Sequence, residues 1–235
     1  MKIRDCDINI NVCGEGNCIL LLHGWGQSHI QMEMIQQAFM HKYCVVNLDL
    51  PGFHQSEEPS YPWNMETYSD VIYDMLQALH CETPIIIAHS FGARIALHYA
   101  YKYPCKGLIL TGAAGIKPPR NISYYLKVYT YKILKHFHLK KQYGSKDYQN
   151  ASTTMKGVLV QCVNEDLTPL LPHIQAPTLL IWGKQDDVTP LWMGKKMAQL
   201  IPNAHLIPIH GGHFAYLKNE RFIPIIKAYL QEVCK

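Results

Sequence analysis

Short runs of apolar residues recur along this chain, and stretches with the apolar spacing of helices separate most of them. The runs lie at residues 18–22, 43–48, 84–88, 107–111, 178–182 and 204–209. A short continuous apolar run is typical of a strand that is buried on both faces, as strands of parallel sheets are. Parallel neighbours need a crossover connection, usually a helix, so this alternation predicts an α/β fold. We expect a mostly parallel central sheet with helices on both faces.

The first residues show a different pattern, in which polar and apolar residues alternate. Residues 7–12 read Asp-Ile-Asn-Ile-Asn-Val, and the segment 14–17 that follows contains two glycines. Alternation of this kind is typical of a strand with one exposed face, and such a glycine-containing segment favours a turn. We therefore expect one or two antiparallel edge strands here.

The chain of 235 residues is long enough for one large α/β domain, but one connection is longer than a crossover needs. It runs from Thr111 to Thr178. We predict that residues 117–166 form a small helical lid, inserted after the sixth expected strand and placed over the carboxyl ends of the strands. Residues 1–116 and 167–235 would then form the core.

The predicted lid carries most of the positive charge of the chain. It contains nine Lys and Arg residues against three Asp and Glu, a net charge of +6, whereas the remainder has 13 against 15, a net charge of −2. Residues 121–141 also show helical apolar spacing. One interpretation is a solvated helix face with lysines over tyrosines. The other is attraction of anionic substrates or loose contact with an anionic membrane surface. We expect no nucleic-acid binding, because no recognised module accompanies the charge.

Residues 84–94 are typical of a buried strand, a sharp turn that carries Ser90, and the start of a helix. The turn matches the nucleophile pattern G-x-S-x-G, except that Ala88 stands in the first glycine position. A serine hydroxyl becomes a useful nucleophile only beside a base, with donors for the developing oxyanion. An isolated match of this kind equally describes a serine that starts a helix.

Two backbone amides are candidates for those donors. The apolar run 18–22 leads into His23-Gly24-Trp25-Gly26, a glycine-rich loop that can present the amide of Trp25. The amide of Phe91 opens the helix after Ser90, where N–H groups have no partner within the helix and the helix dipole is positive.

A candidate base and a carboxylate to orient it occur near the carboxyl end of the chain. After the run 178–182 comes an acidic turn with Asp186 and Asp187, and we expect Thr189 and Pro190 at the cap and first position of the next helix. The last apolar run leads into a Gly-Gly loop that carries His213, the candidate base.

Five motifs in this order resemble those of the α/β-hydrolase fold family. They are the H-G-W-G loop, the D-L-P-G-F turn, the serine turn, the W-G-x-x-D-x-x-x-P segment and the G-G-H-F loop. The resemblance covers nearly the whole chain, and the order Ser, Asp, His is the order in that family.

The resemblance implies a role for each candidate. Ser90 would be the nucleophile, His213 the general base and then acid, and Asp186 the orienting carboxylate, with the amides of Trp25 and Phe91 as the oxyanion hole.

Position within the family segment favours Asp186 over Asp187, because Asp186 falls third after Gly183 and four before Pro190. We name Gly24, Val188 and Phe214 as further candidate substrate-binding residues.

Two residues depart from the family pattern. Ala88 keeps a small side chain at the serine turn, which we expect to be tolerated. His54 follows the D-L-P-G-F turn where many members of the family have a second glycine. If that position needs positive φ, histidine adopts it at some cost, and its ring then contacts substrate or faces water.

These roles predict two-step hydrolysis of carboxylic esters, with small, short-chain acyl groups preferred. One alternative is a C–C bond hydrolase or a lyase like that of menaquinone biosynthesis, in which Arg94 and the basic lid receive an anionic substrate. A second is an aminopeptidase acting on N-terminal proline, which the scarcity of acidic residues in the lid disfavours. A third is a ligand-binding signalling protein that hydrolyses its ligand slowly.

The remaining features narrow the class of protein. Eight cysteines are scattered without a C-x-x-C pair, which favours free thiols and a cytoplasmic protein. The charged start of the chain does not resemble a secretory signal, and no apolar run is long enough to cross a bilayer. Without a phosphate-binding glycine loop or metal-ligand spacing, we expect no cofactor and no metal. We expect a monomer or small homo-oligomer whose partner is a small-molecule ester.

Overall fold

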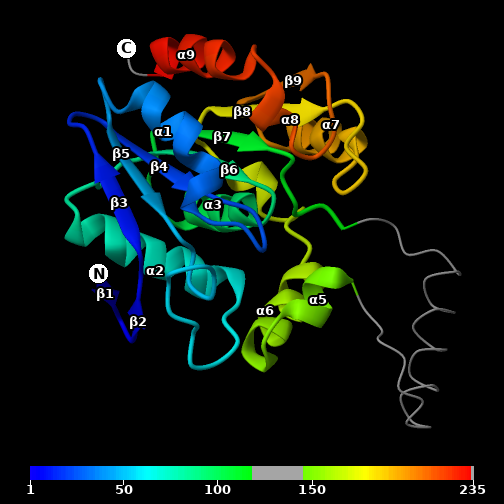
Figure 1. The fold of residues 1–235 in the computed structure, drawn as a ribbon. Coiled ribbons are helices and arrows are strands. Elements are labelled where there is room, and N and C mark those ends of the chain that lie inside the picture. The colour runs from blue at the N-terminus through cyan, green and yellow to red at the C-terminus, as the bar shows by residue number, and fades with distance from the viewer. Residues whose placement is uncertain (118–144, 234–235) are drawn as a thin grey trace, which may run out of the picture.

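The structure is a computed structural model that describes residues 1–117 and 145–233. Its centre is a seven-stranded sheet (Figure 1). In spatial order the strands are β3 (Ile10–Cys13), β5 (Cys44–Leu48), β4 (Cys18–Leu22), β6 (Ile85–His89), β7 (Gly107–Thr111), β8 (Thr178–Gly183) and β9 (Ala204–Ile209). All neighbours pair in parallel except β3 and β5, which are antiparallel. The predicted mostly parallel sheet with an antiparallel edge strand is confirmed.

Helices cover both faces of this sheet. Figure 1 shows α1 (Glu33–Phe39) and α9 (Phe222–Val233) on one side, and α2 (Met65–Ala78) and α3 (Phe91–Lys102) on the other. Successive residues of a strand point to opposite faces, so Leu20 packs in the α2 and α3 layer while Leu21 packs in the α1 and α9 layer. This explains why the central strands appear in the sequence as continuous apolar runs.

The amino-terminal residues form more structure than one edge strand. β1 (Lys2–Ile3) and β2 (Cys6–Asp7) pair with each other in a separate two-stranded sheet before β3 begins. With these two strands included, β7 is the seventh strand of the chain, and the long connection follows it.

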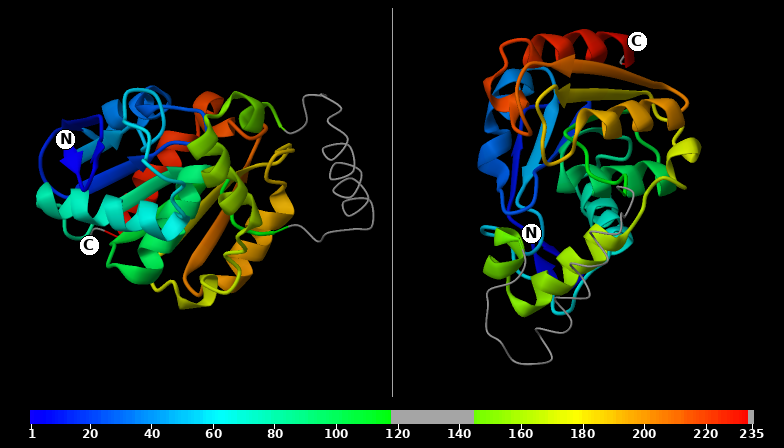
Figure 2. Two further views of the ribbon diagram at one scale, coloured as in Figure 1. Left: turned by 90° about the horizontal axis from the view of Figure 1, so that it is seen from below. Right: turned by 90° about the vertical axis from the view of Figure 1, so that its right-hand side faces the viewer.

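Part of that connection is described. Two helices, α5 (Lys146–Asn150) and α6 (Thr153–Asn164), lie beyond the layer formed by α2 and α3 (Figure 2). The side chain of Ser152 caps α6 by accepting a hydrogen bond from the amide of Met155. The expected amphipathic helix at 121–141 lies outside the described residues, so a lid with the boundaries 117 and 166 stays a prediction.

The remaining described helices connect the strands or follow the last one. η1 (His29–Met32) precedes α1, η2 (Leu171–His173) precedes β8, α7 (Leu191–Leu200) connects β8 to β9, and α8 (Ala215–Lys218) precedes α9. Within the described ranges, no helix combines the length and the apolar character that crossing a bilayer requires.

Candidate active site

Ser90 lies between the end of β6 and the start of α3, in a strained backbone conformation with φ 50° and ψ −105°. Positive φ is uncommon for a residue with a side chain, and such strain persists where the surroundings enforce it. Here the amide of Ser90 donates to the carbonyl of Thr111 at 3.1 Å, and that of Gly92 donates to the carbonyl of His23 at 3.1 Å. The turn therefore holds the Ser90 hydroxyl at the carboxyl end of the sheet.

Gly92 is required by this turn for a separate reason. A Cβ atom at this position would lie 2.6 Å from the carbonyl oxygens of Leu22 and His23. Backbone atoms of a central strand cannot move aside, so the helix approaches β4 closely only because this residue has no side chain.

The structure brings together the three side chains that the motifs singled out. The Nε2 atom of His213 lies 3.0 Å from Oγ of Ser90, and Nδ1 of the same ring lies 2.9 Å from Oδ2 of Asp186. His213 is on the loop after β9, and Asp186 is on the turn after β8. Asp186 is buried whereas Asp187 is exposed, so only the first of the neighbouring carboxylates faces the imidazole.

The carboxylate of Asp186 receives several hydrogen bonds. The amides of Val188 and Thr189 donate to its Oδ1 atom at 3.0 and 2.8 Å. Burial by itself would raise the pKa of Asp186, but hydrogen bonds from His213 and Thr189 outweigh burial and hold this pKa below its ordinary value. The residue is therefore an anion at neutral pH, as a partner for an imidazolium must be.

Thr189 contributes a contact that the motifs did not single out. Its Oγ1 atom lies 2.9 Å from Oδ2 of Asp186 and 3.1 Å from the carbonyl oxygen of Gly112. The expected helix cap at Thr189 is wrong by one residue, because α7 begins at Leu191 with Pro190 in the cap position. The available signal was the spacing Asp-x-x-Thr, in which a carboxylate accepts from amides two and three residues later.

The glycine-rich loop that carries Trp25 is held from two sides. His23 is fully buried; its Nδ1 atom lies 2.8 Å from the carbonyl of Gly24, and its Nε2 accepts from the amide of Leu50 at 2.9 Å. Burial lowers the pKa of His23 to about 4, so the ring is neutral and can donate from one nitrogen while accepting at the other. The ring of Trp25 packs edge-on against that of Phe91, with centroids 5.2 Å apart. The two candidate oxyanion donors therefore come from adjacent segments.

A pocket of about 510 Å³ lies beside Trp25, between this loop and the helices α5 and α6. Its lining combines apolar side chains with two carboxylates, and includes Trp25, Gly26, Phe53, Glu58, Asp147 and Met155. Among the described residues, this lining does not include the other expected substrate-binding positions, Gly24, Val188 and Phe214. Val188 is 61% exposed and Phe214 47%, and the Phe214 ring lies 5.2 Å from that of His213. They lie at the site without forming the walls of this pocket.

His89 lies beside the candidate base. Its buried ring lies 4.7 Å from the ring of His213. Burial, reinforced by the neighbouring His213, lowers the pKa of His89 to about 3. The ring is neutral and its Nδ1 lies 3.0 Å from the carbonyl of Thr111. His89 thus supports His213 by packing and does not replace it.

Arg94 does not reach the reactive groups. Its side chain is buried, and Nη1 donates to the carbonyl of Glu165 at 3.3 Å. This hydrogen bond joins α3 to the end of α6.

His54 has φ 48°, so the position does require positive φ, and its Nδ1 lies 3.1 Å from Asp49.

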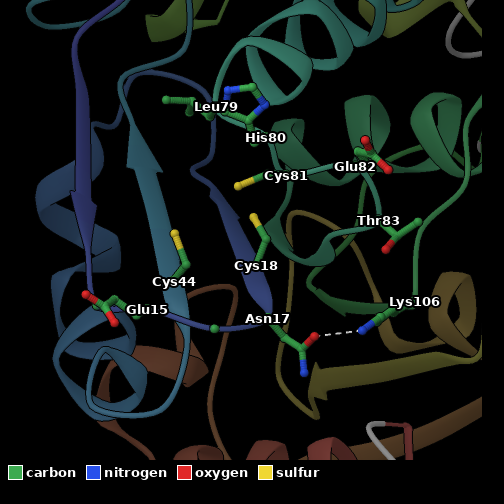
Figure 3. A pocket seen from close by; sticks show the side chains of 12 residues that line it. Glu15, Asn17, Cys18, Cys44, Leu79, His80, Cys81, Glu82, Thr83 and Lys106 are labelled. Carbon is green, nitrogen blue, oxygen red and sulfur yellow. Dashed lines mark hydrogen bonds between the residues drawn. The ribbon is translucent and has the colours of Figure 1, made fainter.

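A different pocket, of about 470 Å³, opens near the amino ends of the parallel strands (Figure 3). Its lining includes the thiols of Cys18, Cys44 and Cys81. Burial, reinforced by hydrogen bonding with Cys81, raises the pKa of Cys18 far above its ordinary value, so this thiol is not a nucleophile at neutral pH. The pocket lies at the opposite end of the sheet from Ser90.

Comparison with known proteins agrees with this geometry. A model of the alpha/beta hydrolase family matches residues 19–225. The chain is 31% identical to an uncharacterised protein of Mycobacterium tuberculosis, in a match that covers 49% of this chain and only 34% of the relative. It therefore spans about a third of the length of that relative.

Two further similarities extend over nearly the whole chain. The pimeloyl-[acyl-carrier protein] methyl ester esterase of Chromobacterium violaceum is 23% identical over 94% of this chain and 97% of its own length. A thermophilic esterase from Thermogutta terrifontis has a similar structure, with a TM-score of 0.77 and 21% identity, covering 97% of this chain and 94% of the esterase. The family match alone spans most of the sequence, and the protein therefore belongs to the alpha/beta hydrolase family.

Proposed function

We propose that this chain is a serine hydrolase that cleaves carboxylic esters of small, short-chain acyl groups. The observation that carries the proposal is the continuous series of contacts from Ser90 through His213 to Asp186, with distances of 3.0 and 2.9 Å. These distances are within hydrogen-bonding reach, so the imidazole can take the serine proton while the carboxylate stabilises the resulting imidazolium.

The reaction would proceed in two steps. Oγ of Ser90 attacks the ester carbonyl as Nε2 of His213 takes its proton, and the same nitrogen returns the proton to the leaving alcohol. His213 then activates water, which hydrolyses the acyl-enzyme. The amides of Trp25 and Phe91 would stabilise the oxyanion in both steps, a contribution worth about 10²- to 10³-fold in rate for each donor.

The pocket beside Trp25 supports a neutral acyl group of modest size. Phe53 and Met155 supply apolar surface there, while Glu58 and Asp147 add negative charge that would repel an anionic acyl chain. The likeness to a methyl ester esterase over nearly the whole chain supports a small ester as the scissile group. We infer that the substrate presents an uncharged acyl portion to this pocket.

The alternative of a C–C bond hydrolase or lyase on an anionic substrate lacks the residue that was expected to bind that substrate. That alternative relied on Arg94 to receive a carboxylate, but this side chain is buried and its Nη1 atom donates to the carbonyl of Glu165. The ester hydrolase remains the better supported proposal.

The test is a substrate panel with the wild type and Ser90→Ala. We expect turnover of p-nitrophenyl acetate and butyrate by the wild type, and its loss in Ser90→Ala with an unchanged circular dichroism spectrum. A fluorophosphonate probe should label the wild type once per chain and leave the variant unlabelled.

Other outcomes would identify the alternatives. Activity confined to dicarboxylates would favour the lyase, and cleavage of prolyl substrates alone would favour the aminopeptidase. Very slow turnover combined with a ligand-dependent rise in melting temperature would favour the signalling protein. Ester turnover that survives Ser90→Ala would overturn the proposal itself.

A further inference from the structure

Three side chains of the kinds that bind transition metals converge outside the serine site. They are His29 at the start of η1, Asp49 directly after β5, and His54 at the end of the following turn. One ligand atom from each lies within 4.8 Å of the other two. Nδ1 of His29 is 2.9 Å from Oδ1 of Asp49, and Nδ1 of His54 is 3.1 Å from Oδ2.

The carboxylate at the centre of this cluster is fixed and charged. Asp49 is fully buried, and its oxygens accept hydrogen bonds from the amide of His29 and from the side chain of Asn9, each at 2.8 Å. A buried, oriented anion is what holds a cation, and its further hydrogen-bond partners are typical of the residues that orient metal ligands.

The position of His54 is a second observation. It has φ 48°, a conformation that glycine adopts freely and that costs a residue with a side chain about 1 kcal/mol or more. The imidazole of His54 points at the buried carboxylate of Asp49, and the imidazole of His29 faces the same carboxylate. Its side chain is 37% exposed, so a solvated ion can reach the cluster.

The spacing of the atoms is close to that of a metal site. In tetrahedral sites with Zn–N and Zn–O bonds of about 2.0–2.2 Å, neighbouring ligand atoms are about 3.3 Å apart. The nitrogen–oxygen distances of 2.9 and 3.1 Å, one to each oxygen of Asp49, are shorter than this by a few tenths of an ångström. One ligand atom of each residue lies within 4.8 Å of the other two, so rotation of the side chains would bring all three onto one ion.

We propose that His29, Asp49 and His54 form a binding site for a divalent transition-metal ion with the preferences of Zn²⁺. Two imidazole nitrogens and a carboxylate suit first-row ions of this kind better than Mg²⁺ or Ca²⁺. Each imidazole would bind through Nδ1 and carry its proton on Nε2, and solvent would complete the coordination.

This site would bind metal independently of ester hydrolysis. The turn from Asp49 to His54 is joined to the glycine-rich loop, because the amide of Leu50 donates to His23 at 2.9 Å. A bound ion would therefore brace this turn against the segment that carries Trp25. We expected no metal from the sequence, because the three ligands do not follow a recognised spacing.

The test uses the whole chain, treated with EDTA and then freed of it, in calorimetric titrations with Zn²⁺ alone. We expect one saturable site in the wild type, and Zn²⁺ affinity at least about tenfold weaker in both His29→Gln and His54→Gly. Glycine relieves the positive φ at position 54, so this variant is expected to fold. Thermal unfolding checks that expectation, and Zn²⁺ should raise the melting temperature of the wild type more than that of either variant.

Two control variants separate this cluster from other histidines. His41→Gln removes an exposed imidazole elsewhere, and His213→Gln removes an imidazole that faces a different buried carboxylate, that of Asp186. Both should bind Zn²⁺ as tightly as the wild type. The proposal is overturned if the wild type shows no saturable binding, if folded His54→Gly binds equally well, or if binding is lost in His213→Gln.

Discussion

Asp186 and Asp187 are adjacent and chemically identical, yet the structure gives them different environments. The first is buried and lies 2.9 Å from His213, whereas the second is exposed. Only a carboxylate in contact with the imidazole can select its tautomer and stabilise its charge. The contrast makes this pair a matched test of the proposed machinery.

We expect Asp186→Asn to lower kcat for p-nitrophenyl butyrate by about 10⁴-fold, because an amide cannot stabilise the imidazolium or hold the required tautomer. Asp187→Asn should change kcat by less than about twofold, since exposed charges contribute little. Steady-state kinetics on both variants measures the contrast. The reverse ranking would show that the other carboxylate serves the imidazole.

Thr189 is a positioning residue, because its Oγ1 atom lies 2.9 Å from Oδ2 of Asp186 and 3.3 Å from Nδ1 of His213. Thr189→Val removes a hydrogen bond to a carboxylate, a contribution of about 1.5–3 kcal/mol, so we expect kcat to fall by about tenfold or more with KM unchanged. The pKa of Asp186 should rise, because one of the interactions that lowers it is lost. Thr189→Ser keeps the hydroxyl and should restore kcat. A purely structural role would lower stability and leave the kcat of the folded enzyme unchanged.

At the scale of elements, the strand–turn–helix unit around Ser90 depends on a close approach. The start of α3 lies against the carboxyl end of β4, and the amide of Gly92 donates to the carbonyl of His23. This contact connects the serine turn to the glycine-rich loop, so the candidate nucleophile and the candidate oxyanion donors are positioned by the same pair of strands.

Gly92→Ala should destabilise the protein by about 1–3 kcal/mol, because the added Cβ would meet two carbonyl oxygens at 2.6 Å and the backbone must shift. Gly212→Ala is a matched control, since the nearest atom to its added Cβ is 3.6 Å away. Urea denaturation of both variants gives the two free energies of unfolding. Equal stability would mean that α3 can retreat from the sheet at little cost.

At the scale of the whole molecule, Asp49 connects segments from different parts of the chain. Its side chain is fully buried and bonds to Asn9 before β3 and to His29 before α1. The pKa of this carboxyl is lowered from 3.8 to about 2, so its ionised form stabilises the folded state. That contribution is complete above the unfolded pKa and is lost as the pH falls through the folded pKa.

We therefore expect Asp49→Asn to lower the free energy of unfolding at neutral pH by about 2 kcal/mol, measured by urea denaturation in EDTA. The difference from the wild type should shrink as the pH falls from about 4 toward 2. A difference that grows with falling pH would contradict the assigned direction. His41→Gln, which leaves the cluster intact, should follow the wild type throughout.

Much of the fold was predictable because it depends on local pattern. Residues 18–22 and 107–111 were expected as buried strands and form β4 and β7 with those bounds. Ser90 was recognisable because its turn has a local requirement for small neighbours. By contrast, the contact of Arg94 with Glu165 and the closeness of His89 to His213 join residues far apart in the sequence. No periodicity encodes such pairs.

The sequence by itself determined the class of fold, the order of its strands along the chain and the segments that carry the candidate reactive groups, because apolar runs and turn residues act over a few neighbours. Only the tertiary structure decided that Thr189 contacts the carbonyl of Gly112, and that His29 and His54 face one carboxylate. Those contacts exist because the order of strands in the sheet places the ends of distant segments side by side, and the carboxyl ends of parallel strands all meet at one edge.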